Sequence, residues 1–63
     1  MSENSKKFWL ETTTGNNGAH NYGMSSARGC TLSDLPTDEV PAGSSAFDYT
    51  KKAIYFFDGV SWN

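Results

Sequence analysis

The sequence predicts an all-β fold: a small antiparallel β-meander with a long irregular N-terminal arm. Apolar and polar residues alternate through Ser45–Tyr49, which is the period of a strand with one wet face. Ala53–Phe57 is rich in the aromatic and β-branched residues that suit a pleated sheet. The Asp58-Gly59 pair that follows indicates a two-residue hairpin turn, because Gly readily adopts the positive φ that a type I′ turn requires.

Strands are therefore expected near residues 44–49, 53–57 and 60–62. A further strand is expected near residues 6–13, where the β-prone run Phe-Trp-Leu-Glu-Thr-Thr precedes a Gly-Asn-Asn-Gly turn cluster. The three C-terminal strands are expected to form an antiparallel meander around an aromatic face. The strand near residues 6–13 could cover Ile54 and Phe56 or pair with a neighbouring subunit.

Residues 16–30 show no sustained period, so we expect them to form an extended arm. A structureless stretch of that length is uncommon inside a compact domain, which suggests that the arm lies on a partner surface. Pro36 and Pro41 bound a constrained linker into the meander. The chain is read as a single small domain, with strand, arm and linker in residues 1–42 and the meander in residues 43–63.

The expected turn lengths predict a register for the meander. The two-residue turn would pair Phe57 with Val60, and a three-residue loop at 50–52 would pair Phe47 with Tyr55. This register gathers the expected core on one face: Phe47, Tyr49, Tyr55, Phe57, Val60 and Trp62. The opposite face would carry Asp48, Ile54, Phe56 and Ser61.

Ile54 and Phe56 would then form an apolar patch that the rest of the chain or another subunit must cover. The first strand and the arm offer further large apolar side chains for such a contact. The expected interface residues are Phe8, Trp9, Leu10, Tyr22, Ile54 and Phe56. Backbone pairing at exposed strand edges would add to this contact.

A short pattern runs through residues 35–62: Leu35-Pro36, then Val40-Pro41-Ala42-Gly43-Ser44, a hairpin, and Tyr55-Phe56-Phe57-Asp58-Gly59 closing on Trp62. It resembles the pattern of small tailed-bacteriophage virion proteins of the head-decoration or head-fibre-associated type. The resemblance implies a small β module that belongs to a virion. Relatives often have Gly at the position of Lys52, so Lys52 would carry strain in a left-handed conformation.

Size and charge narrow the functional classes. The chain has 63 residues, one cysteine and a net charge of −2. A chain this small buries only about 60% of its unfolded surface and cannot form an intramolecular disulfide, so we expect a homo-oligomer or a subunit docked on others. Its few basic residues form no stripe, so direct nucleic-acid binding is not expected. No apolar run is long enough for a membrane span, and the N-terminus lacks the apolar segment of a signal peptide.

The residues that could carry chemistry have simpler interpretations. Cys30 and His20 could pair as nucleophile and base, but no third, orienting group is evident. Asp58 is interpreted as the turn residue before Gly59 rather than as half of a carboxylate pair with Asp48.

Two further groups of residues, one acidic and one aromatic, also have simpler interpretations than a binding site. The acidic residues Asp34, Asp38 and Glu39 lack the ligand spacing and the Gly of a calcium loop. A sugar-stacking platform could be built from Trp9, Tyr22 and Trp62, but packing is favoured because a chain this small needs its large aromatic residues for burial. No catalytic, cofactor-binding or metal-binding residue is therefore assigned.

These observations predict a non-enzymatic structural component of a bacteriophage virion, either a capsid decoration or a head-fibre-associated subunit. It would be assembled in the host cytoplasm, dock on other virion proteins and need no cofactor. The alternative is a small aromatic-rich module that binds a glycan or a host protein.

Overall fold

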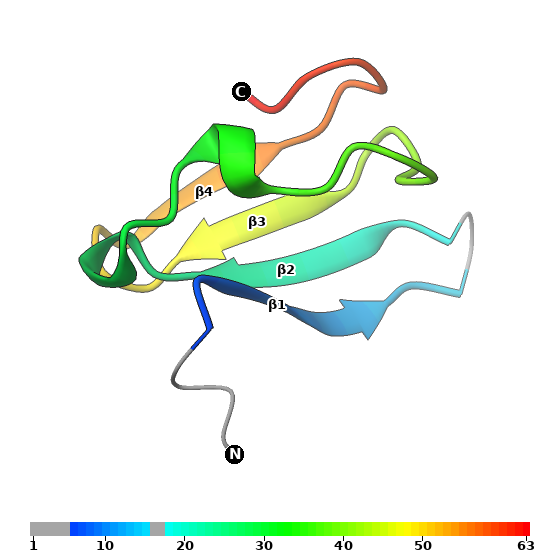
Figure 1. Cartoon of the computed structure of the whole chain (residues 1–63). Coiled ribbons are helices and arrows are strands. Elements are labelled where there is room, and N and C mark those ends of the chain that lie inside the picture. The colour runs from blue at the N-terminus through cyan, green and yellow to red at the C-terminus, as the bar shows by residue number, and fades with distance from the viewer. Residues whose placement is uncertain (1–5, 16–17) are drawn as a thin grey trace.

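The computed structural model describes residues 6–15 and 18–63, which form one four-stranded sheet in the order β1-β2-β3-β4 (Figure 1). The strands are Phe8–Thr13 (β1), His20–Met24 (β2), Ser45–Asp48 (β3) and Ala53–Phe56 (β4). Two short 3-10 turns, Ser26–Arg28 and Leu32–Asp34, lie between β2 and β3. The predicted all-β fold class is confirmed.

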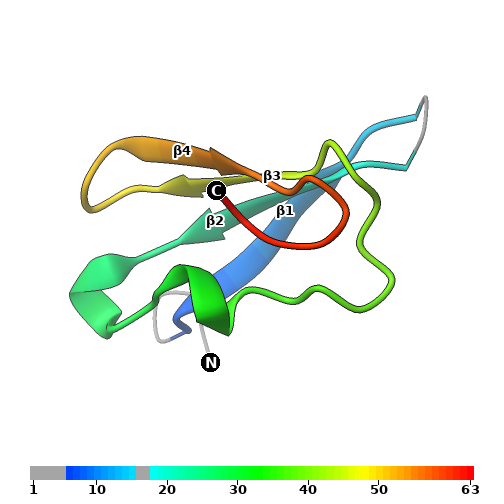
Figure 2. The ribbon, with the colours of Figure 1, turned by 90° about the horizontal axis from the view of Figure 1, so that it is seen from above.

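The sheet is not a pure meander. The pairs β1–β2 and β3–β4 are antiparallel, but β2 and β3 run parallel. Parallel neighbours require a crossover connection, and residues 25–44 provide it on one side of the sheet (Figure 2). The expected third strand of the meander is reduced to an isolated bridge between Phe57 and Trp62.

The expected irregular arm contains the central strand β2, so this prediction is wrong. Tyr22 of β2 pairs with Leu10 on one side and with Ala46 on the other. The composition of the strand, His-Asn-Tyr-Gly-Met, has little β-propensity, and its conformation is imposed by pairing on both edges. Residues 16 and 17 of the expected arm lie outside the described residues.

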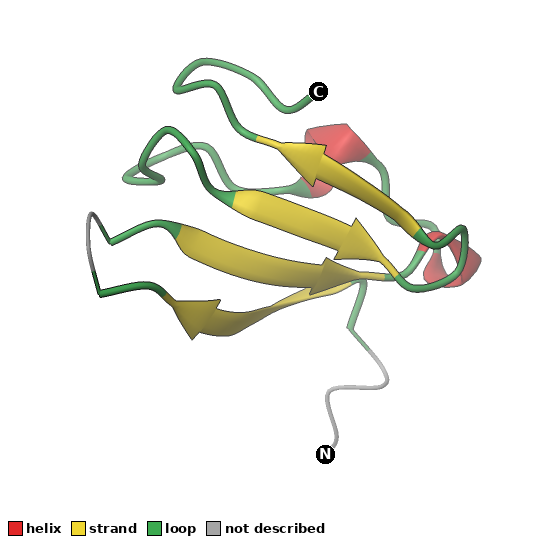
Figure 3. Cartoon of the chain, turned by 180° about the vertical axis from the view of Figure 1, so that it is seen from behind, coloured by secondary structure: helices red, strands yellow, loops and turns green. Residues whose placement is uncertain are grey.

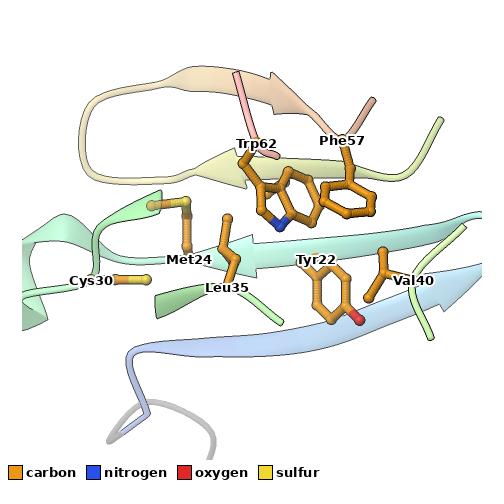
Figure 4. Packing of buried hydrophobic residues seen from close by; sticks show 8 residues of the cluster. Tyr22, Met24, Cys30, Leu35, Val40, Phe57 and Trp62 are labelled. Carbon is orange, nitrogen blue, oxygen red and sulfur yellow. The ribbon is translucent and has the colours of Figure 1, made fainter. Parts of the chain in front are cut away.

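The core lies between the sheet and the crossover (Figure 4). Trp62 packs against Phe57 with ring centroids 5.1 Å apart and meets Tyr22 edge-on at 6.0 Å. Its indole N–H donates to the Pro36 carbonyl at 3.0 Å, which attaches the C-terminal tail to the crossover. The buried cluster consists of Tyr22, Met24, Cys30, Leu35, Val40, Ala46, Phe57 and Trp62.

The small core is normal for a chain of this size. The accessible surface of 4040 Å² is close to the roughly 4,000 Å² expected of a compact monomer of this mass. The expectation that the chain could not bury an adequate core by itself is therefore not supported by its compactness.

The β3–β4 register differs by one residue from the predicted one. Phe47 pairs with Ile54, and Ala46 pairs with Tyr55. The loop between the strands spans residues 49–52, one residue more than predicted, and this turns Phe47 away from the core. Of the expected core residues, Phe57 and Trp62 are buried and Tyr55 packs against the cluster. The core prediction is wrong for Phe47, Tyr49 and Val60. Phe47 lies on the other side of the sheet, and Tyr49 and Val60 are 48% and 83% exposed.

The C-terminal turn is closed by Asp58. Its Oδ1 atom accepts the backbone N–H groups of Val60 at 2.8 Å and Ser61 at 2.7 Å. Gly59 follows it with a φ of +101°, a region that favours glycine. The role of Asp58 as a turn residue is confirmed, but the two-residue hairpin is wrong, because Phe57 pairs with Trp62 rather than with Val60.

Asp48 was expected on a wet face and is instead buried, with 1% of its surface exposed. Its Oδ1 atom accepts backbone N–H groups from Thr50 at 2.9 Å, Ser26 at 3.3 Å and Lys51 at 3.4 Å. Burial raises the pKa of this carboxyl group, but the hydrogen bonds outweigh burial and hold the pKa below its usual value. The carboxylate thereby ties the β3–β4 hairpin to the first turn of the crossover.

Removing the charge of Asp48 should destabilise the fold in a pH-dependent manner. Asp48→Asn should lower the free energy of unfolding at neutral pH by about 1–3 kcal/mol, because a charged acceptor of three N–H groups is lost. The pKa is lowered in the folded state, so the contribution of the carboxylate is present above the ordinary aspartate pKa and is lost as the pH falls through the lowered value. Urea denaturation at several pH values should therefore show the difference shrinking on acidification. Asp38→Asn, at an exposed position, is the control, and a difference that stays constant with pH would contradict the assignment.

Lys52 has a φ of +56°, the left-handed conformation in which a non-glycine residue is strained. Lys52→Gly should raise the free energy of unfolding by about 0.5–1 kcal/mol, because the relief of strain exceeds the entropy that Gly loses on folding. Lys51→Gly, one residue earlier and outside the positive-φ positions, should instead lower it by a similar amount. Equal losses in both variants, measured by chemical denaturation, would refute the strain at Lys52.

Candidate functional site

The side of the sheet opposite the core is not crossed by any described segment, as the view from behind shows (Figure 3). Large apolar side chains gather on this side from β1, from β3 and the loop after it, and from β4. We call this surface the aromatic face and define it by Trp9, Phe47, Tyr49, Ile54 and Phe56. Ile54 and Phe56 are each 54% exposed, so the predicted apolar patch is present and uncovered by the described chain.

A cross-strand row forms the centre of the aromatic face. The register places Trp9 beside Gly23, Gly23 beside Phe47, and Phe47 beside Ile54. A Cβ atom added at Gly23 would lie 2.5 Å from Cε2 of Trp9, so the indole ring rests directly on the backbone of β2. Glycine inside a central strand is explained here by this close approach.

Glu11 fixes the polar edges of the aromatic rings. Its Oε2 atom accepts the Tyr49 hydroxyl at 2.6 Å and the Trp9 indole N–H at 3.1 Å. The Tyr49 ring meets Trp9 edge-on at 5.9 Å and Phe47 at 4.8 Å. The hydrogen bond to Glu11 raises the pKa of Tyr49, because it favours the protonated phenol.

A polar row lies beside the apolar one. Asn21 donates from Nδ2 to the Thr12 hydroxyl at 2.8 Å, and Ser45 donates to Oδ1 of Asn21 at 2.9 Å. The register places Ser45 opposite Phe56, so this row ends at an exposed aromatic ring. The polar side chains of the row therefore bond to one another across three strands.

The expected interface residues divide between the two sides of the sheet. Trp9, Ile54 and Phe56 lie on the aromatic face. The interface prediction is wrong for Tyr22, which is buried in the core, where Phe8 packs against it edge-on at 6.2 Å. Leu10 is 50% exposed and lines a hollow of about 620 Å³ together with Lys6, Lys7, Phe8, Trp9, Tyr22 and Pro36.

The sugar-stacking platform of Trp9, Tyr22 and Trp62, which was weighed as the alternative to packing, does not form. Tyr22 and Trp62 are in the core, whereas Trp9 lies on the other side of the sheet. Glu11, Gly23, Phe47 and Tyr49 also belong to this surface, which the sequence pattern did not predict. The two-residue spacing of Trp9 from Glu11 is the signal that could have placed this pair on one face. Phe47 and Tyr49 were predicted to share a face, but on the core side of the sheet.

Cys30 and His20 are not brought together. His20 begins β2 and places Nδ1 3.0 Å from the Tyr22 hydroxyl, whereas Cys30 follows the other end of β2 and is buried beside Met24 (Figure 4). Burial raises the pKa of the Cys30 thiol, and the nearby Asp34 carboxylate adds to the rise. This environment favours the thiol over the nucleophilic thiolate.

Asp34 has a local structural role. Its Oδ2 atom accepts the Thr31 backbone N–H at 2.8 Å, which closes a capping box around the second 3-10 turn. Within residues 6–15 and 18–63, no group of three or more His, Cys, Asp or Glu side chains could hold a metal ion. Among the same residues, no helix is long and apolar enough to cross a membrane.

The chain matches no family model, and searches of curated proteins and of solved structures find no match. The function must therefore be argued from the resemblance in residues 35–62 and from the geometry of the aromatic face.

The close fit of Trp9 over Gly23 gives a direct test of the aromatic face. Gly23→Ala should displace the indole ring and lower the free energy of unfolding by about 1–3 kcal/mol, because the new methyl group has no space. The indole N–H resonance of Trp9 should shift, since its hydrogen bond to Glu11 is disturbed. Gly15→Ala is the control, because nothing lies within 4 Å of the added carbon. It should leave both the free energy of unfolding and the Trp9 resonance nearly unchanged. An unchanged Trp9 resonance in Gly23→Ala would show that the ring does not rest on β2.

Proposed function

We propose that this chain is a non-enzymatic structural component of a bacteriophage virion, a capsid decoration or head-fibre-associated subunit. It docks on other virion subunits through the aromatic face and needs no cofactor. The observation that carries the proposal is the uncovered aromatic face, on which Ile54 and Phe56 are each about half exposed. The resemblance of residues 35–62 to small tailed-bacteriophage proteins supplies the biological setting.

The chemistry of the aromatic face supports a role in protein contact. The buried centres of protein interfaces are enriched in Trp, Tyr and Phe and depleted of charged groups. The aromatic face combines rings from three strand segments, and the carboxylate of Glu11 beside them already accepts two hydrogen bonds. A surface of this composition suits contact with another protein better than contact with a charged ligand.

The sheet edges offer a second kind of contact. β1 and β4 are the outer strands, so each has one side without a strand neighbour in the sheet. At the end of β4 the backbone of Phe56 bonds to Asn63 in both directions, at 3.0 and 2.9 Å. The C-terminal tail therefore closes one end of this edge, and a partner strand would have to approach nearer to Ile54.

Two sequence features that predicted an assembly role do not support it in the structure. The expected arm over neighbouring subunits contains the central strand β2 and continues into the crossover, and the chain is as compact as its mass requires. The proposal therefore depends on the aromatic face and the resemblance alone.

Mass spectrometry of purified particles tests the proposal. Virions of the phage whose genome carries the gene should contain the chain in many copies, and the variant Phe56→Lys should be depleted from them, because its charge must be desolvated in the contact. Val60→Lys, a matched change at an exposed site away from the aromatic face, should be retained. A chain that is abundant in the infected cytoplasm but absent from particles would overturn the structural role in favour of a small regulatory binder.

A further inference from the structure

Several polar side chains on the aromatic face do not depend on water for their hydrogen bonds. Its polar side chains bond to each other: Tyr49 and Trp9 donate to Glu11, and Ser45 bonds to Asn21, which donates to Thr12. Covering a polar group is unfavourable chiefly when its hydrogen bonds to water are not replaced. Because the bonds among Thr12, Asn21 and Ser45 are already made, a second surface can cover these side chains without supplying partners for them. The charged carboxylate of Glu11 is exposed on the outer strand β1 and can stay in contact with water at the rim.

The exposed area is in the range that a weak dimer needs. Tyr49, Ile54 and Phe56 are 48%, 54% and 54% exposed. With side chains that bury about 150–250 Å² when fully covered, these three contribute roughly 300 Å². Trp9, Phe47, Asn21 and Ser45 are partly exposed and Thr12 is exposed, so the face is larger than these three side chains alone. Two copies together would approach the roughly 1,000 Å² that is the lower limit for a specific interface.

The shape of the aromatic face restricts its occupant. It is the surface of a four-stranded sheet, and sheets carry a twist of one hand. Two such surfaces stack about 10 Å apart with their strands nearly aligned, so that side chains interdigitate. A second copy supplies a surface of the same size, twist and apolar character, and a two-fold contact between identical faces is closed.

The charge pattern also favours a second copy. The aromatic face offers no cluster of one sign among the described residues that would select an oppositely charged partner, and Glu11 is held by two donors. Lys51 and Lys52 lie in the loop after β3, outside the five residues that define the face. Glu11 is exposed on the outer strand β1, so two copies can meet without bringing like charges into the centre of the contact.

We propose that a second copy of this chain covers the aromatic face, so that two sheets stack into an eight-stranded sandwich. The inference deepens the proposed function and rests on it only for the biological setting, because it names the subunit that occupies this surface. Phe47 of β3 and the Trp9 ring, which rests over Gly23 of β2, lie at the centre of each face, and Ile54 and Phe56 extend the contact to the β4 edge.

Sedimentation equilibrium of the purified chain, from micromolar to millimolar concentration, tests the dimer. A reversible monomer–dimer equilibrium is expected, since the area is at the lower limit of specific interfaces. Ile54→Lys and Phe56→Lys should each weaken dimerisation at least tenfold, because each places a charge in the contact. Val60→Lys is the matched control, since Val60 is 83% exposed but lies in the C-terminal turn, and it should leave the equilibrium unchanged.

Circular dichroism of each variant shows whether the fold is retained, and the two positions 54 and 56 provide independent measurements. A wild-type chain that stays monomeric at millimolar concentration would overturn the inference. So would a folded Ile54→Lys and a folded Phe56→Lys that dimerise as the wild type does. These outcomes are separate from those of the virion experiment, because a chain that dimerises in solution but is absent from particles refutes the virion role and leaves the dimer intact.

Discussion

The parallel pairing of β2 with β3 determines where the connecting residues and the core must lie. Antiparallel neighbours are joined by a short turn, but parallel neighbours need a connection that returns to the starting end of the sheet. Residues 25–44 make this return on one side and bring Cys30, Leu35 and Val40 into the core. The return uses most of the connecting residues of the chain. The aromatic face is therefore left to be covered by something other than the described segments.

Two buried polar residues hold the crossover at the ends of β3. At one end, the Ser44 hydroxyl accepts the backbone N–H of His20 at 2.9 Å and donates to the Pro41 carbonyl at 2.7 Å. At the other end, Asp48 accepts backbone N–H groups from the crossover and from the hairpin loop. An apolar residue at either site would leave buried backbone groups without partners. The side chains of Ser44 and Asp48 thus form hydrogen bonds with backbone groups of the connection. In a larger crossover the internal hydrogen bonds of a helix do this.

The existence of β1, β3 and β4 could be predicted because their residues repeat with period two or favour strands intrinsically. The strand β2 could not, because Gly23 and Asn21 disfavour strands locally and gain their places only from Trp9 and from neighbouring hydrogen bonds. The register was wrong for a similar reason. A carboxylate between Phe47 and Tyr49 indicates a wet face, but Asp48 finds three backbone donors that only the folded crossover and loop supply.

The one-residue difference in register also explains why only part of the candidate site was predictable. In the predicted register the second face carried Ile54 and Phe56, and Phe47 and Tyr49 lay in the core. In the structure the burial of Asp48 turns these two rings outward, where they join Trp9. Exposed aromatic surface is a liability for solubility unless it is covered by a partner. The bonds that Glu11 makes to two of these rings keep the surface in one defined arrangement, so a partner would meet a preorganised face and not one that must first be ordered.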